Sequence, residues 1–216
     1  MWPVQATAFL VGISLLGAQG PLLTYLGTDP AIGYGLGLDT TQRSNVVGAY
    51  LLSLIVGAVL FAVASRRTSP RVPLIGSAVL VGIGYALLLP LHDEPWQVLL
   101  SLGVAGIGAG ALIAAMPAAA AAAAPRGRTG MASAMTNTTK IMGGTMSSAF
   151  FGVVLAGGAA TAIGTAAPFT GYVTVWVVCS ASGLLAAVLL AFVPSAAFSD
   201  AAEAKVAATA ARGELV

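Results

Sequence analysis

The sequence predicts an all-α polytopic membrane protein, and three observations carry this prediction. The 216 residues are 58% hydrophobic and only 7% charged, whereas a soluble domain usually carries about 25% charged residues. The apolar residues gather in six runs that are long enough to cross a bilayer, which takes roughly 17–25 residues. The basic residues cluster in short loops on one side of these runs. We therefore expect the lipid bilayer, rather than water, to surround most of the chain.

Six spanning helices are expected within residues 1–194, followed by a polar cytoplasmic tail over residues 195–216. The expected spans are about 4–26, 46–64, 72–91, 96–118, 131–155 and 171–193. The loops GTDPAIGYGLGLDTTQ, SRRTSPR, HDEP and PRGR separate the first five spans, because Gly, Pro and charged residues favour turns. A loop without charge precedes the sixth span, and the fourth span is expected to run into the alanine tract 118–124.

Loop charges predict how the chain crosses the membrane. The first 42 residues contain no Lys or Arg, so the first run is expected to be a retained helix rather than a secretory signal. The loops after the second and fourth spans and the tail carry seven basic residues: Arg66, Arg67, Arg71, Arg126, Arg128, Lys205 and Arg212. The opposite side holds only Arg43. The positive-inside rule then places both termini in the cytoplasm of a plasma (inner) membrane, with the five loop arginines anchoring the cytoplasmic face.

The fifth span has two different faces at 100° per residue. Small and polar residues share one face: Gly130, Asn137, Lys140, Gly144 and Ser148. Large apolar residues share the opposite face: Met135, Met142, Met146 and Val153. We expect the small face to pack against other helices or to line a wet cavity, and the large face to meet lipid or packing neighbours.

Small residues in the fourth and fifth spans predict close helix contacts. Gly106 and Gly110 form a GxxxG pair, and Gly143, Gly144 and Ser148 continue the pattern in the fifth span. Such residues allow two helix backbones to approach closely. The pattern fits either tight static packing or helices that rock against their neighbours.

Gln19 is the strongest polar candidate within a span. Gln5, Gly12 and Gln19 are spaced seven residues apart and are expected on nearly the same helix face. A glutamine deep in a membrane needs hydrogen-bond partners or water. Gln19 is therefore expected either to line a substrate cavity or to make an interhelical hydrogen bond. Pro21 is expected to kink or loosen this helix.

Asn137 and Lys140 are the other polar candidates for a substrate cavity or gate. Asn137 is expected to form helix-packing or gating hydrogen bonds rather than to bind a ligand directly. Lys140 either lines the path or extends its ammonium group toward cytoplasmic head groups.

The residues missing from the spans restrict the function. No Asp, Glu or His falls well inside an expected span, and the sequence has no metal-ligand cluster, phosphate-binding GK[ST] loop or GxSxG motif. The sequence therefore predicts a protein that is not an enzyme, needs no cofactor or metal and does not bind nucleic acid. A proton-coupled carrier needs a titratable group in its path, and the spans offer only Lys140.

Three stretches resemble the C-terminal six-helix half of a major facilitator superfamily transporter, in particular a bacterial drug:proton antiporter of the fourteen-helix branch. They are TYLGTDPAIGYGLGLDTTQ, GVAGIGAGALIAAMP and GMASAMTNTTKIMGGTMSSAFFG. The last resembles the family's eleventh helix, and five of its residues match that pattern: Gly130, Asn137, Lys140, Gly143 and Gly144. The resemblance covers about residues 4–193.

This resemblance implies half of a major-facilitator fold, built as a three-plus-three inverted repeat. It implies efflux of small amphipathic or drug-like molecules by alternating access, with proton coupling in the complete protein. The substrate would lie between this half and a second six-helix half, either an N-terminal half or another copy. The alternative is a truncated or accessory half-transporter that has no transport activity and acts as a membrane-embedded interaction partner.

Overall fold

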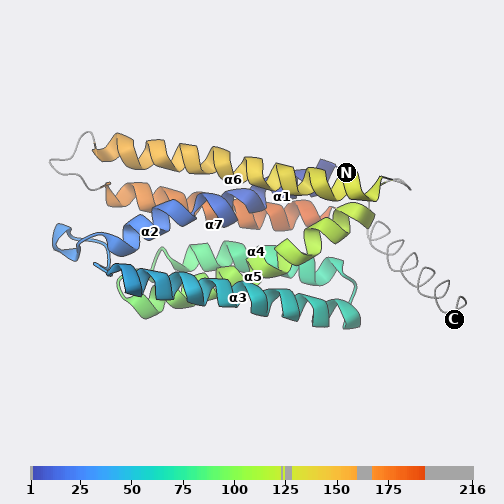
Figure 1. Cartoon of the computed structure of the whole chain (residues 1–216), viewed down its shortest axis with the longest axis horizontal. Coiled ribbons are helices and arrows are strands. Elements are labelled where there is room, and N and C mark those ends of the chain that lie inside the picture. Colours follow the sequence, from blue (N-terminus) through green and yellow to red (C-terminus); the bar gives the residue numbers. More distant parts are fainter. Residues whose placement is uncertain (1, 123, 125–127, 160–166, 193–216) are drawn as a thin grey trace, which may run out of the picture.

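The computed structural model describes residues 2–122, 124, 128–159 and 167–192, and within them the regular structure is helical (Figure 1). The α-helices are α1 Trp2–Gly12, α2 Gln19–Gly27, α3 Thr40–Arg67, α4 Arg71–Leu87, α5 Pro95–Ala122, α6 Thr129–Ala159 and α7 Phe169–Ala191. A π-helical turn, Ile13–Gly17, joins α1 to α2, and a 3-10 turn, Pro30–Ile32, lies in the loop before α3. Arg126 and the expected tail 195–216 lie outside the described residues.

Five of the described helices are long and apolar enough to cross a membrane. They are Pro3–Gly27, which runs through the π turn, and the helices α3, α5, α6 and α7. Helix α4 is apolar but has only 17 residues. It ends at Leu87, before the expected boundary at residue 91, because Pro90 cannot donate a backbone hydrogen bond and restricts the residue before it.

The first span is broken upstream of Pro21. Pro21 has no N–H group, so the carbonyl of Gly17 lacks its normal partner four residues on. The helix widens into the π turn over Ile13–Gly17, which ends at this carbonyl. The hydroxyl of Tyr85 from α4 donates a hydrogen bond of 2.6 Å to the backbone oxygen of Ser14. A neighbouring helix thus stabilises the break, as is usual for irregular helices in membranes.

Helix α3 begins at Thr40, six residues before the expected start at residue 46. A capping box fixes this start. The Asp39 carboxylate accepts a hydrogen bond of 2.7 Å from the backbone N–H of Gln42, and Gln42 Oε1 accepts one of 3.0 Å from the backbone N–H of Asp39. These two bonds satisfy N–H groups that the first turn of a helix otherwise leaves unpaired.

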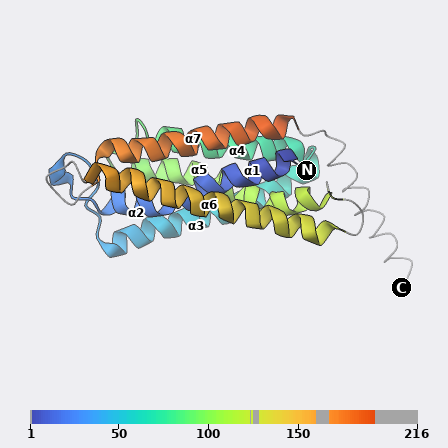
Figure 2. The ribbon, with the colours of Figure 1, turned by 90° about the horizontal axis from the view of Figure 1, so that it is seen from above.

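The helices form a bundle in which the central helices pack on several neighbours (Figures 1 and 2). Helix α1 packs on α6 and α7, α5 packs on α3 and α4, and α4 packs on α7. Helices α3 and α6 are the least covered, with 17% and 22% of their most apolar windows buried, against 50–61% for the other spanning helices. Much of their apolar surface therefore faces outward.

The two ends of the bundle carry opposite charges. Arg66, Arg67, Arg71 and Arg128 lie where α3 and α5 end and α4 and α6 begin, and we call this the basic end. The acidic end carries the carboxylates of Asp29, Asp39, Asp93 and Glu94, together with Arg43. The loop before α3 folds back at the acidic end, where Gly35 has φ +92° and contacts Thr28 so closely that a side chain would not fit. Tyr34 anchors the same loop through a hydrogen bond from its hydroxyl to the backbone oxygen of Ala167.

Candidate substrate cavity

A cavity of about 250 Å³ lies beside Gln19, between α2 and α3. Its walls are mainly apolar, with Leu22 from α2 and Val47 from α3, and it reaches Tyr85 on α4 and Leu102 on α5. The Gln19 amide and the Tyr50 hydroxyl are polar groups in this wall. An apolar cavity with a few polar groups suits a small amphipathic molecule.

The π turn places Gln19 in this cavity. Gln19 is the first residue of α2 and follows the π turn after a single residue. Because a π turn is wider than an α-helical turn, it rotates α2 relative to α1. Gln5 and Gly12 on α1 contact α6, whereas Gln19 lines a cavity together with α3. The expectation that Gln5, Gly12 and Gln19 share one face therefore fails at the π turn.

Gln5 joins α1 to α6 through its side-chain amide. Gln5 Nε2 donates to Thr136 Oγ1 at 3.1 Å, and Thr139 Oγ1 donates to Gln5 Oε1 at 2.9 Å. A methyl group at Gly12 would overlap the backbone oxygen of Lys140, and one at Gly143 would overlap that of Phe9. The helices approach closely here, and the Gln5 amide and the two threonine hydroxyls satisfy each other between them.

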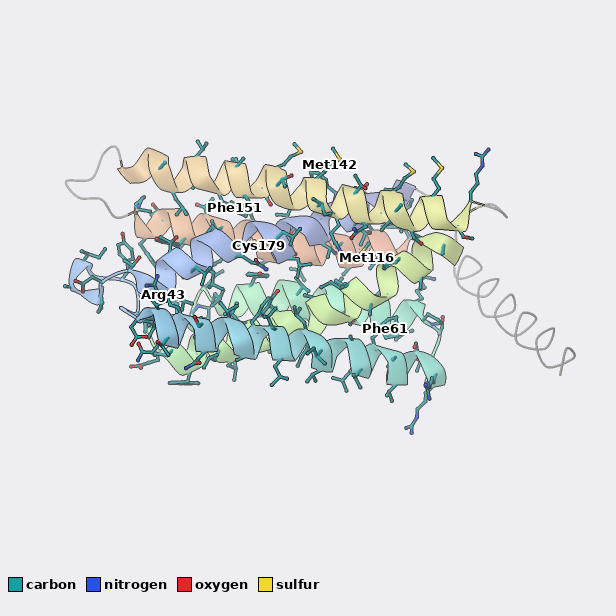
Figure 3. The ribbon with its side chains drawn as sticks, in the orientation of Figure 1. Arg43, Phe61, Met116, Met142, Phe151 and Cys179 are labelled. Carbon is teal, nitrogen blue, oxygen red and sulfur yellow. The ribbon has the colours of Figure 1, made fainter. Side chains whose placement is uncertain are left out.

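The buried face of α6 is rotated from the expected one. Its buried residues are Ala132, Thr136, Gly143, Gly144, Ser147 and Phe151. Gly130, Asn137 and Ser148, which were expected on this face, are exposed. The expected apolar face is exposed as predicted, and Figure 3 shows Met142 pointing away from the bundle. The α1 backbone at Phe9 sits against Gly143, and the Leu16 side chain of the π turn sits against Gly144; these contacts set the rotation of α6.

Asn137 and Lys140 do not line the cavity beside Gln19. Lys140 is half-buried on α6 and forms no ion pair within 4.0 Å among the residues that the structure describes. Thr136 and Thr139 make the polar contacts of α6 with α1 that were expected of Asn137. The three polar candidates from the sequence are therefore not brought together.

Glycines on α5 allow a close crossing with α3. A methyl group at Gly106 would overlap the Ser53 hydroxyl, and one at Gly110 would overlap the backbone oxygen of Leu54. Gly57 on α3 makes the reciprocal contact with the backbone of Ile107. The sequence pattern pointed to the α5 glycines but missed Gly57. Ser53, four residues before Gly57, forms a small-residue pair with it at the same spacing, and this pair is the signal on α3 that could have found it.

Four of the five loop arginines lie in the described residues, and all four are at the basic end. Arg66, Arg67 and Arg128 are exposed. Arg71 is half-buried and donates a hydrogen bond from its guanidinium to the backbone oxygen of Ala191, which joins the start of α4 to the end of α7. Arg71 therefore stabilises the bundle as well as carrying charge.

We expect Tyr85→Phe to loosen the π turn. Tyr85 is 4% exposed and Ser14 is 1% exposed, so removing the hydroxyl leaves a buried carbonyl unsatisfied, at a cost of about 1–3 kcal/mol. The expected result is a lower melting temperature and faster amide exchange around the π turn. Tyr50→Phe is the matched control, because the Tyr50 hydroxyl lines the same cavity and donates no hydrogen bond within the described part of the chain. Equal melting temperatures of the two variants would contradict this role of Tyr85.

A helical bundle in which five of the described helices are long and apolar enough to cross a membrane is the architecture of a multi-pass membrane protein. The family model of the Major Facilitator Superfamily matches residues 6–213 of the chain. The chain therefore belongs to the Major Facilitator Superfamily, whose members are transporters rather than enzymes. Comparisons with curated proteins and with solved structures gave no match.

Proposed function

We propose that the chain exports small amphipathic molecules across the plasma membrane by alternating access, and that Gln19 contacts them. The observation that supports this most directly is the apolar cavity of about 250 Å³ beside Gln19, in a chain of the Major Facilitator Superfamily. The π turn next to Gln19 supplies a place where the first span can bend, because helices kink at π turns, and π turns are frequent at functional sites. Movement of α2 against α3 would then open and close the cavity.

The proposed architecture has six spans arranged as a three-plus-three inverted repeat, with both termini in the cytoplasm. One repeat is α1/α2, α3 and α4, and the other is α5, α6 and α7. The packing supports this, because the first helix of each repeat packs on the second and third helices of the other: α1 on α6 and α7, and α5 on α3 and α4. The apolar helix α4 is the proposed sixth span. The basic end would face the cytoplasm.

A second six-helix half is the proposed partner. Helices α3 and α6 leave large apolar side chains uncovered, among them Leu52 at 62%, Ile55 at 63% and Met146 at 60% exposure. Lipid covers part of such a surface, and a second half would cover the remainder, as in transporters built from two halves. The described spans hold no Asp, Glu or His well inside them, so the groups that carry coupling protons would lie in that second half.

The same observations support a second candidate function. A chain with uncovered apolar helices and no carboxylate deep in its described spans also fits an accessory half that binds a partner in the membrane and transports nothing itself. Transport by the purified chain distinguishes the two functions. Dye efflux from proteoliposomes that contain the chain, above the leak of empty liposomes, supports the transporter.

We expect Gln19→Leu to lower the initial rate of efflux of an amphipathic dye from these proteoliposomes by about tenfold, since about 1.4 kcal/mol of polar interaction would be lost. The amount of folded protein is expected to stay the same, because Gln19 is exposed in the cavity wall. Asn137→Leu is the control, because Asn137 lies outside the cavity, and this variant should keep the wild-type rate. A Gln19→Leu variant with unchanged efflux would remove Gln19 from the site.

A further inference from the structure

We propose that a groove at the acidic end binds amphipathic oxyanions, and that Arg43 pairs with their charged group. The ligands are soluble molecules that carry one carboxylate or sulfonate on an apolar body. This inference rests on the proposed transport function and specifies its substrate class.

Three adjoining hollows make up the groove along α2 and α3. The first is the cavity beside Gln19, the second has a volume of about 450 Å³, and the third has one of about 560 Å³. Leu23 lines all three, Val47 and Leu51 line the first two, and Arg43 lines the last two. The groove therefore runs from an apolar region beside Gln19 to a polar region at Arg43, which matches an apolar body that carries one polar group.

The guanidinium of Arg43 is held over Gly27 and is available to a ligand. A methyl group at Gly27 would lie 2.6 Å from Arg43 Nη1 and 2.8 Å from Cζ, so the absence of a side chain there makes room for the guanidinium. Arg43 Nε donates to the backbone oxygen of Asp39 at 3.5 Å. Among the described residues, no carboxylate lies within 4.0 Å of the guanidinium. Figure 3 shows Arg43 between the ends of α2 and α3. Its terminal N–H groups can bind a carboxylate in a two-pronged geometry.

Tyr172 supplies a second observation at the same place. Tyr172 lines the third hollow with Arg43 and is only 1% exposed. Its buried hydroxyl has no hydrogen-bond partner in the part of the chain that the structure describes. A buried polar group without a partner is unfavourable, and a ligand oxygen would satisfy it. An oxyanion has several acceptor positions, so one that is paired with Arg43 keeps acceptor positions free for a donor such as the Tyr172 hydroxyl.

The distribution of charge favours an anion over a cation in this groove. Among the described residues, Asp29 is the one carboxylate that lines it, and its Oδ1 already accepts a hydrogen bond of 2.9 Å from the backbone N–H of Ala31. Asp29 is exposed, so water and salt screen its charge, whereas Arg43 is half-buried and is screened less. Asp39 caps α3, and Asp93 lies 3.5 Å from His92 outside the groove.

The test compares two probes of similar size, naphthalene-2-carboxylate and (naphthalen-2-yl)methylammonium. Binding is measured by equilibrium dialysis against the full chain in phosphatidylcholine nanodiscs, after subtraction of binding to empty nanodiscs. We expect the carboxylate to bind more tightly than the ammonium. Arg43→Gln should weaken carboxylate binding about tenfold or more, since it removes a charge-assisted hydrogen bond, and should not weaken ammonium binding.

Gly27→Ala gives a second variant that keeps the charge of Arg43. The added methyl group meets the flexible end of the Arg43 side chain, so the guanidinium moves while the backbone stays in place. We expect weaker carboxylate binding in this variant as well, and Gly20→Ala on the same helix, where a methyl group meets nothing within 4 Å, should bind as wild type.

Two results would overturn the inference. The first is carboxylate binding that survives both Arg43→Gln and Gly27→Ala. The second is an Arg43→Gln variant that loses co-purified phosphatidylglycerol but binds the carboxylate as wild type does. This result would mean that Arg43 binds a lipid head group. Either result leaves the proposed transport function intact if dye efflux still depends on Gln19. Absence of dye efflux with Arg43-dependent carboxylate binding would instead contradict transport and support the binding site.

Discussion

Gly110→Ala is expected to disrupt the contact between α3 and α5 and to lower the stability of the chain strongly. The added methyl group would overlap the backbone oxygen of Leu54. A backbone atom cannot move aside as a flexible side chain can, so the whole of α3 would have to shift. Overpacking of this kind costs about 1–3 kcal/mol and occasionally more. Gly57 lies against the same crossing from the other side, so a shift of α3 disturbs its contact with Ile107 too.

Cys179 provides the measurement for this prediction. It is the single cysteine of the chain, and it is fully buried in α7. A thiol-reactive fluorophore therefore reports unfolding as the protein is heated in detergent. Gly103→Ala is the matched control, because Gly103 lies in α5 and a methyl group there meets nothing within 4 Å. This control should be neutral or slightly stabilising, since Ala favours a helix by up to about 1 kcal/mol over Gly. If both variants melt as wild type does, the crossing is not tightly packed.

The sequence predicted those features of the fold that depend on composition and helical periodicity. The membrane class and the resemblance to the Major Facilitator Superfamily were confirmed by the apolar helices and the family match, whereas the drug:proton antiporter half stays a prediction. Periodicity also placed Met142 on the exposed face of α6. It could not separate Ser147 from Ser148, because adjacent residues differ by only 100° and the contact with α1 decides which of them is buried.

The position of Gln19 could not be predicted from a regular helical period. The spacing of Gln5, Gly12 and Gln19 assumes an unbroken α-helix, whereas the π turn changes the phase between Gly12 and Gln19. Pro21 predicted a kink or loosening of the helix, but not that it would be a π turn or which way α2 would rotate. These features depend on the hydrogen bond from Tyr85 of α4 to the Ser14 carbonyl. The early start of α3, in contrast, could have been predicted from the sequence. Asp39 and Gln42 have the spacing of a capping box, whereas the expected start at residue 46 was taken from the apolar run alone.

Trp176→Ala is expected to have the largest effect on stability at the acidic end. Trp176 is 2% exposed and lies in an aromatic cluster that joins α2, α7 and the loop between α4 and α5. Its ring meets Tyr25 edge to face, with centroids 5.1 Å apart and an interplanar angle of 81°, and lies 5.5 Å from the His92 ring. Replacing a buried Trp with Ala costs about 3–5 kcal/mol, and the lost edge-to-face contact contributes to this.

Trp96→Ala is the matched control, because it removes the same side chain from a position that is 60% exposed at the start of α5. We expect Trp176→Ala to expose Cys179 to the thiol-reactive fluorophore at a much lower temperature, and Trp96→Ala to melt close to wild type.

The aromatic cluster also holds Tyr172, whose ring centroid lies 5.3 Å from that of Tyr25. Trp176→Ala should therefore weaken naphthalene-2-carboxylate binding below the melting temperature, because Tyr172 loses its fixed position beside Arg43. Weakened binding in Trp96→Ala, or intact binding in Trp176→Ala, would show that the cluster stabilises the acidic end without positioning the groove.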